Sequence, residues 1–193
     1  MIDVKDDETL KWRFSDASLH MTIYLALGSN LGDREEHLRS AIRGLQKRGI
    51  EIVRCGSIYS TEPREVLNQP WFLNTVLEAS THLAPDELLA ACLDVETSNL
   101  RNRDTSKGPR TLDIDIIFYG NEIVRKQGLT IPHPSFSLRR FVLTPLAEVA
   151  AGFVDPGSGK TIRQLLEACT DSAIVTLVSG APAFSRPSPT ERL

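Results

Sequence analysis

The segment KGPRTLDIDIIFYGN, from Lys107 to Asn121, constrains the fold of this chain more than any other segment. Side chains of a β-strand alternate between its two faces, which here predicts one continuous apolar face. That face consists of Leu112, Ile114, Ile116 and Phe118. Asp113 and Asp115 then share the opposite face, where two neighbouring carboxylates need arginines or metal ions to offset their repulsion. The strand must therefore have a core on one side and cations on the other.

Strands and helices alternate along the chain around this segment. Strands are predicted over residues 22–30, 50–60, 71–80 and 111–120, and helices over 33–49 and 85–100. Apolar periodicity, together with the turn and cap residues between the segments, supports this order. The order βαββαβ predicts the α+β class, with a ferredoxin-like antiparallel sheet and helices packed on it. Two additional C-terminal helices, over 145–150 and 162–169, are expected on the outside.

The sequence also supports three local predictions within these elements. Gly56 interrupts the second strand and indicates a bulge there. Residues 121–126 are expected to return beside the strand over 111–120. The second helix is predicted to bury a stripe made of Leu89, Leu93 and Leu100. Glu96 falls on that stripe, so its carboxylate lies either at an exposed end or points toward a site.

Length and composition bound the organisation of the chain. With 193 residues and 41% hydrophobic content, one core is expected, in a domain over residues 21–170. Residues 1–20 read as an N-terminal extension, and residues 171–193 as a partly disordered tail rich in proline and serine. No apolar run approaches the roughly 20 residues that cross a bilayer, and the N-terminus lacks an apolar signal-peptide stretch. We therefore expect a cytoplasmic protein without a membrane partner.

Charge and cysteine content exclude other classes of protein. The net charge of −3 argues against a partner nucleic acid bound through the electrostatics of the whole surface. The three cysteines, Cys55, Cys92 and Cys169, lie far apart and have no zinc-type spacing. Buried, reduced thiols are therefore expected rather than disulfides or a zinc site.

Residues 155–161, with the sequence DPGSGKT, resemble the phosphate-binding loop of nucleotide hydrolases. Val154 stands where that loop requires its first glycine, and no buried parallel strand leads into the segment. A turn followed by a helix, capped by Thr161 with Gln164 reaching back, explains the segment better. The nucleotide site is therefore expected elsewhere.

Asp113, Asp115 and the basic residues before them have the composition of a magnesium–polyphosphate site. Residues two apart on a strand have Cα atoms about 6.5 to 7 Å apart, so both carboxylates can reach cations between them. Mg²⁺ prefers oxygen ligands and is commonly bound by one or two carboxylates plus substrate phosphates. The basic residues are Arg101, Arg103, Lys107 and Arg110, and arginine grips phosphate through paired hydrogen bonds. The alternatives are a structural ion-pair network and a solvated, mobile charged loop.

The segment GPRTLDIDIIFYGN also closely resembles the signature of the hydroxymethyldihydropterin pyrophosphokinase family of folate biosynthesis. Other segments similar to this family occur in the same order, from about Thr22 to Cys169. They are ALGSNLGD, YSTEP, QPWFLN, VETSNLRNR, IPHP and RRFVLTPLAEVA. The resemblance implies transfer of the β,γ-pyrophosphoryl group of ATP, the co-substrate, to the hydroxymethyl oxygen of a reduced pterin. It further implies release of AMP and a requirement for two Mg²⁺ ions.

The resemblance implies roles for individual residues as well. Asp113 and Asp115 would hold both metal ions, and Arg103 and Arg110 would act with them as catalytic residues. The nucleotide-binding residues would be Glu96, Arg101, Arg103, Arg110, Ile116, Thr130, His133 and Arg139. The pterin-binding residues would be Thr61, Phe72, Asn74, Asp113 and Phe141. Without the resemblance, the two phenylalanines are ordinary core candidates, whereas an asparagine in a strand needs a specific partner for its amide.

The chain departs from the family pattern at several positions. Arg64 and Glu65 lie in the loop after Thr61 where many members have a different segment, and Gly128 stands where some relatives have an arginine. The basic loop is short and lacks a tryptophan that some members place before Gly-Pro-Arg. None of these differences touches the Asp-x-Asp pair.

Two other functions remain consistent with the residues alone. One is a kinase that transfers only the γ-phosphoryl group to a small heterocyclic alcohol, and the other is a ferredoxin-like regulatory module that binds a nucleotide without catalysis. For the pyrophosphokinase we expect a monomer whose partners are ATP and a reduced pterin. Residues 61–70 and 101–109 are expected to close over these substrates, because excluding water prevents hydrolysis of ATP.

Overall fold

The structure, a computed structural model, describes residues 20–63, 68–99 and 108–184. Its elements are β1 (Met21–Ser29), α1 (Arg34–Gln46), β2 (Glu51–Cys55), β3 (Ile58–Thr61), β4 (Phe72–Thr81), α2 (Pro85–Ser98), β5 (Asp113–Tyr119), β6 (Val124–Lys126), β7 (Leu129–Ile131), the 3₁₀ turn η2 (Phe136–Leu138), α3 (Arg140–Ala150), α4 (Ile162–Glu167) and β8 (Val175–Ser179). Within these ranges the main sheet runs in the order β5-β1-β4-β3-β8, and β2 also pairs with β4. All of these pairings are antiparallel.

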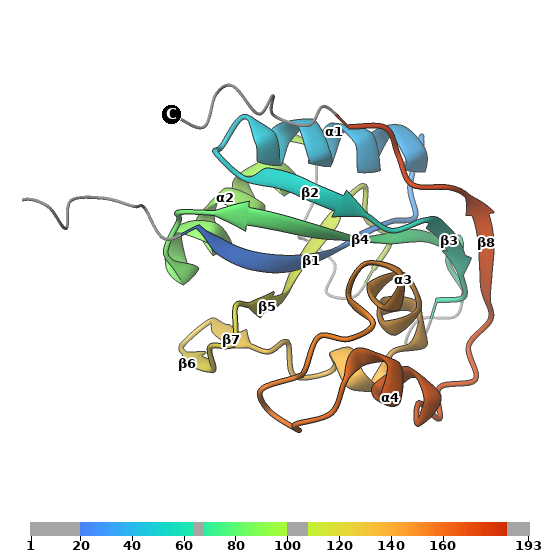
Figure 1. The fold of residues 1–193 in the computed structure, drawn as a ribbon. Coiled ribbons are helices and arrows are strands. Elements are labelled where there is room, and N and C mark those ends of the chain that lie inside the picture. Colours follow the sequence, from blue (N-terminus) through green and yellow to red (C-terminus); the bar gives the residue numbers. More distant parts are fainter. Residues whose placement is uncertain (1–19, 64–67, 100–107, 185–193) are drawn as a thin grey trace, which may run out of the picture.

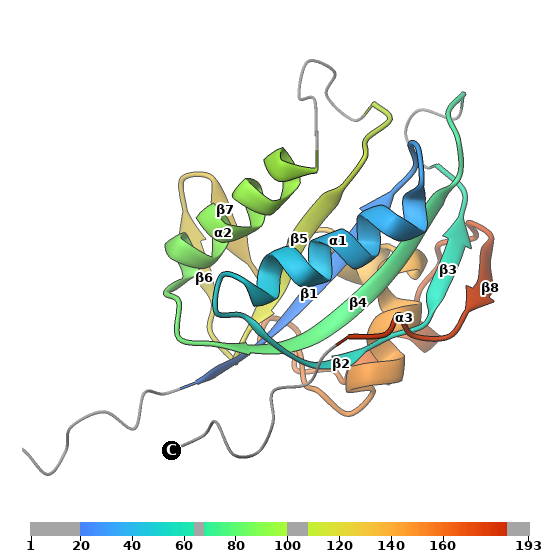
Figure 2. The same ribbon diagram turned by 90° about the horizontal axis from the view of Figure 1, so that it is seen from above.

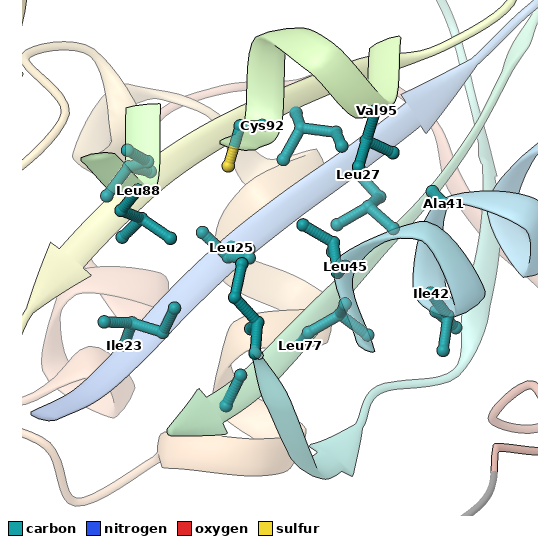
Figure 3. Packing of buried hydrophobic residues seen from close by; sticks show 14 of the residues in the cluster. Ile23, Leu25, Leu27, Ala41, Ile42, Leu45, Leu77, Leu88, Cys92 and Val95 are labelled. Atoms are coloured by element: carbon teal, nitrogen blue, oxygen red, sulfur yellow. The ribbon is translucent and has the colours of Figure 1, made fainter. Parts of the chain in front are cut away.

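The main sheet is covered by helices on both faces. Helices α1 and α2 lie side by side on one face, and α3 and α4 lie on the other (Figures 1 and 2). Alternate residues of β1 supply the core under α1 and α2, where Ile23, Leu25 and Leu27 are at most 1% exposed. Figure 3 shows these side chains packed against Leu45 of α1 and Cys92 of α2. The predicted α+β class and ferredoxin-like arrangement are confirmed.

The ends of helix α1 follow the signals in its sequence. Asp33 is the N-cap, and its side chain accepts a hydrogen bond from the backbone N–H of Glu36, which satisfies a donor that has no partner inside the helix. Gly49 follows the last turn with φ of +77°, a conformation that favours glycine. The helix therefore begins and ends near the positions predicted.

The single strand predicted over residues 50–60 is wrong, because Gly56 divides it into β2 and β3. Both pieces pair with β4. A Cβ atom at Gly56 would lie 2.9 Å from the carbonyl oxygen of Pro145 in α3, so the chain passes too close to this helix for a side chain. The break directs β3 toward the far end of β4, where Thr61 pairs with Phe72.

The return of residues 121–126 beside the strand over 111–120 is also wrong. Strand β6 instead pairs with β7 in a separate two-stranded sheet, with Val124 opposite Ile131. The turn between them contains Gly128, whose φ is +83°. A short hairpin satisfies its own backbone groups, so β5 has β1 as its only partner within the described sheet.

The alternation predicted for β5 holds only to Ile116. The register between β1 and β5 shifts between Tyr24 and Leu25, so that Leu25 pairs with Ile116 and Tyr24 with Phe118. A bulge reverses the faces beyond it. Phe118 therefore packs with Ile117 in the core under α3 rather than with Ile114 and Ile116 in the core under α2.

The leucine stripe predicted for α2 is wrong by one position in its register. The buried face of the helix consists of Leu88, Cys92, Val95 and Glu96, while Leu89 is only partly buried and Leu100 lies outside the described residues. The buried residues still recur at helical spacing. Glu96, which is 2% exposed, lies inside this stripe rather than at an exposed end.

The C-terminal part contributes more to the fold than predicted. Helix α3 begins at Arg140, five residues before the expected start. Thr161 caps α4, with the side chain of Gln164 bonded back to the Thr161 N–H, as expected. The expected tail contains β8, which pairs with β3, so the packed structure extends beyond residue 170. No described helix is both long and apolar enough to cross a membrane.

The three cysteines are free thiols. Cys92 and Cys169 are buried, as predicted, whereas Cys55 is only partly buried. Burial is the main factor that raises the pKa of Cys55 to about 11 and that of Cys92 to about 12. A thiol with so high a pKa is protonated at neutral pH and is therefore a poor nucleophile.

Candidate active site

One row of residues across the sheet forms the floor of a pocket on the α3 side. Gly28 in β1 pairs with Asn74 in β4 on one side and with Asp113 in β5 on the other. In the next row, Ala26 pairs with Asp115. Residues directly opposite each other in an antiparallel sheet have their side chains about 5 Å apart. The sheet therefore places an amide and two carboxylates close together, separated by a residue without a side chain.

The pocket above this floor has a volume of about 580 Å³, which is within the range of roughly 300–1,000 Å³ usual for small-molecule sites. Its walls come from the ends of β3 and β4, the start of β5, the turn before α3 and α3 itself. The lining residues are Ala26, Leu27, Gly28, Thr61, Glu62, Pro63, Gln69, Phe72, Asn74, Arg110, Asp113, Asp115, His133, Ser135, Leu138, Arg139 and Phe141.

Arg110 supplies the positive charge beside the carboxylates. Its Nη1 donates to Oδ2 of Asp113 at 2.7 Å, and both side chains are about three-quarters buried. Its Cζ atom lies 5.7 Å from the centre of the Phe72 ring, a distance at which cation and ring attract each other. The buried Nε of Arg110 has no hydrogen-bond partner among the described residues. The guanidinium is thus held in the pocket between a carboxylate and an aromatic ring.

The carboxylate set matches the coordination habits of Mg²⁺. Among the described residues, no group of three or more His, Cys, Asp or Glu side chains could hold a metal ion. Asp113 and Asp115 nevertheless both line the pocket. One or two carboxylates, completed by water and substrate phosphates, are the usual protein contribution to a Mg²⁺ site. The donor set therefore fits an ion that is shared with a phosphorylated ligand.

Asn74 forms the opposite end of the floor. Its Nδ2 donates to the hydroxyl oxygen of Thr61 at 2.6 Å, and both residues are buried. Its Oδ1 would lie 2.8 Å from a Cβ atom at Gly28, so the amide extends over the glycine. Phe72 and Phe141 line the same pocket. An amide beside aromatic faces can bind a planar heterocycle that has both donors and acceptors on its edge.

His133 and Arg139 form the wall next to the carboxylates. The His133 N–H donates to the carbonyl of Ile117 at 3.1 Å, which ties this turn to the bulge of β5. Burial and, to a lesser extent, Arg139 lower the pKa of His133, whereas Asp113 raises it by less. The imidazole is therefore neutral at pH 7 and can accept or donate a hydrogen bond. Arg139 lies with its Cζ atom 5.8 Å from the centre of the Phe141 ring.

The structure thus brings together most of the residues that the sequence singled out. They are Thr61, Phe72, Asn74, Arg110, Asp113, Asp115, His133, Arg139 and Phe141. Glu96, Ile116 and Thr130 do not line this pocket. Arg101 and Arg103 lie outside the described residues, as do Arg64, Glu65 and much of the two segments expected to close.

Glu96 acts on the site from the other face of the sheet. Its Oε1 accepts a hydrogen bond at 2.8 Å from the backbone N–H of Ile114, the residue between the two aspartates. Ile116, 5% exposed, belongs to the same core under α2. A buried carboxylate bonded to this N–H fixes the strand that carries Asp113 and Asp115. This position of Glu96 gives no support for the contact with the nucleotide that was expected of it.

Asn30 is a residue of the site that the sequence analysis missed. It is 1% exposed, and its Oδ1 accepts from the Arg110 N–H at 2.7 Å. Its Nδ2 donates at 3.1 Å to both the side chain of Gln69 and the carbonyl of Pro70. The available signal in the sequence was an asparagine placed directly after an apolar strand, where its amide needs a specific partner. Asn30 joins the Arg110 side of the pocket to the loop before β4.

Replacing Gly28 with alanine is expected to weaken binding at the Asn74 end of the pocket. The new methyl group would meet the Asn74 amide oxygen at 2.8 Å, which forces the amide to turn and to lose its bond to Thr61. We expect KM for the heterocyclic substrate to rise about 10-fold, as for loss of one well-placed hydrogen bond. Gly152→Ala is the matched control, because a Cβ atom there meets nothing within 4 Å. Equal KM values for the two variants in steady-state assays would contradict the expectation.

Comparisons with known proteins show the family to which the chain belongs. Residues 24–151 match the family model described as 7,8-dihydro-6-hydroxymethylpterin-pyrophosphokinase. The chain is 42% identical over 157 residues to the 2-amino-4-hydroxy-6-hydroxymethyldihydropteridine pyrophosphokinase of Synechocystis sp., covering 81% of this chain and 80% of that protein. It is 37% identical over 158 residues to the enzyme of the same name from Haemophilus influenzae, covering 81% of this chain and 98% of that one.

Longer proteins contain a similar part. The folic acid synthesis protein fol1 of Pneumocystis carinii is 36% identical over 152 residues, and the chain spans only 20% of its length. The crystal structure of wild-type HPPK-DHPS from Plasmodium falciparum superposes with a TM-score of 0.65 at 14% identity, covering 77% of this chain and 43% of that one. At this identity the superposition supports the fold alone.

Proposed function

The chain belongs to the 7,8-dihydro-6-hydroxymethylpterin-pyrophosphokinase family, and we propose that the pocket over Gly28 is the place where it performs the family's reaction. It is an ATP-dependent pyrophosphoryl transferase that acts on hydroxymethyldihydropterin in folate biosynthesis. This location is supported by one observation: Gly28 pairs with Asn74 on one side and with Asp113 on the other. This row holds the Asn74 amide and the Asp113 carboxylate on either side of Gly28, which supports binding of a heterocycle edge and of charged phosphates on either side of this residue.

In the proposed arrangement, the two substrates of pyrophosphoryl transfer meet over Gly28. The pterin hydroxymethyl oxygen forms a bond to the β-phosphorus of ATP, the bond from that phosphorus to the α,β-bridging oxygen breaks, and AMP and a proton are released. Such reactions depend mainly on positioning and on neutralising charge. Gly28 leaves the space between the amide and the carboxylates open for the reacting groups.

The polyphosphate is assigned to the Arg110 side of the pocket. The position of Arg110 in the lining of the pocket, beside Asp113, supports binding of phosphate oxygens by its guanidinium. Arg139 and the neutral His133 lie on the facing wall and can donate further hydrogen bonds. Arg101 and Arg103, in the basic segment before Arg110, are proposed to bind the phosphates as well.

Two Mg²⁺ ions are proposed at Asp113 and Asp115. When bound there together with ATP, they would neutralise phosphate charge and polarise the pterin hydroxyl. The protein's part is to hold both carboxylates on one face of β5, and Glu96 supports this by fixing the Ile114 N–H between them. Ile116 lies in β5 itself and Thr130 in β7 of the hairpin, and neither lines the pocket. Their contact with the nucleotide is proposed from the resemblance to the family alone.

The pterin is assigned to the Asn74 side. The Asn74 amide can both accept and donate, which suits the edge of a pterin ring, while Thr61 holds the amide in place. Phe72 and Phe141 supply ring faces for stacking. In this structure the Phe72 ring interacts with Arg110, so movement of Arg110 toward bound phosphates would free the ring.

Product identity tests the reaction directly. Incubation of the protein with ATP, Mg²⁺ and 6-hydroxymethyl-7,8-dihydropterin is expected to give AMP and the pterin diphosphate, resolved by chromatography. Formation of ADP would instead identify a kinase that transfers the γ-phosphoryl group.

We further propose that the protein is a monomer, because the described residues that line the pocket all come from one chain. The cytoplasm is proposed as its location from the sequence alone.

A further inference from the structure

The segment between α4 and β8 is bonded to the start of α3, which carries two pocket residues. Oδ2 of Asp171 accepts from the backbone N–H of Arg140 at 2.8 Å. The Arg140 side chain returns two bonds of 2.8 Å, from Nε to the Asp171 carbonyl and from Nη2 to the Cys169 carbonyl. Arg139 and Phe141, on either side of Arg140, line the pocket. Asp171 thus holds the backbone between them.

Asp171 also replaces a cap that α3 lacks. The N-cap position of α3 is Arg139, whose side chain makes no capping bond. The first N–H groups of a helix have no partner inside it, and a carboxylate is a favourable acceptor there. Because a residue 31 positions downstream supplies this acceptor, the N-cap residue is free to be an arginine that faces the pocket.

The same segment is bonded to the opposite wall of the pocket. Oδ1 of Asp171 accepts from the Ala173 N–H at 2.9 Å. The next residue, Ile174, donates its N–H to the side chain of Glu62 at 3.2 Å and accepts from the Glu62 N–H at 3.4 Å. Strand β8 then continues along β3, with Val175 opposite Thr61. Thr61 and Glu62 line the pocket at its Asn74 end.

We propose that Asp171 is a positioning residue for the pterin: its carboxylate fixes the separation between the Phe141 wall and the Thr61 wall of the pocket. The inference rests on the proposed function, because it concerns the same pocket.

One bonded path from the Phe141 wall to the Thr61 wall runs through Asp171, Ala173 and Ile174. Helix α3 is also bonded to β3 further from the pocket, where Glu148 accepts from the Ser57 N–H and the Tyr59 hydroxyl. The residues of the first path lie beyond residue 151, where the match to the family model ends. The residues proposed to position the pterin therefore belong to a segment outside the matched region.

The chain offers a matched control for loss of a buried carboxylate. Asp155 is 5% exposed and Asp171 is 8% exposed. Asp155 accepts from the Gly157 N–H at 2.9 Å, the Ser158 N–H at 3.1 Å and the Ser158 hydroxyl at 2.6 Å. All three bonds stay within its own turn. Alanine at either position should lower the melting temperature, whereas only alanine at 171 removes the carboxylate bonds that join the start of α3 to the segment before β8.

The test compares steady-state kinetics of the full chain at saturating ATP and Mg²⁺. Asp171→Ala is expected to raise KM for the pterin about 10-fold and to change kcat less than about threefold, because binding geometry is lost while the groups around the phosphates remain. Asp171→Asn should recover part of the loss, since its amide oxygen can still accept one bond. Asp155→Ala should leave KM for the pterin within about twofold of wild type.

Two results would overturn the inference. One is an unchanged KM for the pterin in Asp171→Ala, and the other is an equal rise in Asp155→Ala, which would show a general effect of stability. If Asp171→Ala does not fold, Ile174→Pro gives the same test, because proline removes the N–H that binds Glu62 and the side chain is 50% exposed. A wild-type chain that forms no AMP would instead count against the proposed function.

Discussion

Replacing Asp113 or Asp115 with alanine is expected to lower kcat at least about 100-fold, because each change removes a charged ligand from the proposed Mg²⁺ sites. Both carboxylates line the pocket from one face of β5. The effect should be larger for activity than for folding, because both aspartate side chains are partly exposed. Asp113→Ala also removes the ion-pair partner of Arg110, so it should destabilise the fold more than Asp115→Ala does. Single-turnover rates at saturating Mg²⁺ measure the loss.

A control variant separates this effect from a change of surface charge. Asp94 forms an ion pair with Arg48 at 2.5 Å on the outer surface of α1 and α2, and Asp94→Ala removes the same charge away from the pocket. It should retain wild-type kcat within about twofold, as surface substitutions usually do. Nucleotide affinity in Mg²⁺ that is the same for Asp115→Ala and wild type, together with unchanged kcat, would support the regulatory-module alternative instead.

Replacing Arg110 with alanine is expected to lower kcat/KM about 100-fold, and Arg110→Lys should restore only part of this loss. The guanidinium binds Asp113, lies over Phe72 and lines the pocket. Arginine can bind two phosphate oxygens with its planar fork, whereas lysine offers a single charged group. Measurement of kcat/KM for ATP tests this expectation. The value should be highest for the wild type, lower for Arg110→Lys and lowest for Arg110→Ala.

The Arg110 expectation also has a matched control. Arg48→Ala breaks the ion pair with Asp94 on the opposite side of the sheet and should leave kcat/KM unchanged. Full activity of Arg110→Lys would mean that charge alone suffices at this position. Full activity of Arg110→Ala would remove Arg110 from the proposed mechanism.

Much of the fold could be predicted from local sequence. The apolar alternation of β1, the cap at Asp33 and the glycine after α1 each act within a few residues, so their consequences are visible in the sequence. The resemblance to the pyrophosphokinase family added the reaction and a residue set. Most of that set meets in one pocket.

Other features required contacts between segments far apart in the chain. The break at Gly56 follows from its approach to Pro145, and the reversal of Phe118 follows from a shift in register against β1. Glu96 could not be assigned from its helix alone, because its partner is the N–H of Ile114 in another element. The same reason hid Asn30, whose bonds reach Arg110 and Gln69.

The sequence by itself determined that two carboxylates share one face of an apolar strand and that arginines precede them, since both facts follow from alternation and chain order. Only the tertiary structure decided what those carboxylates face. Pairing of β1 with both β4 and β5 sets the Asn74 amide opposite Asp113 across Gly28. Asp171 accepts bonds from the start of α3 and from Ala173, and the next residue, Ile174, is bonded to Glu62 directly after β3. These distances depend on hydrogen bonds between residues tens of positions apart, which no local pattern specifies.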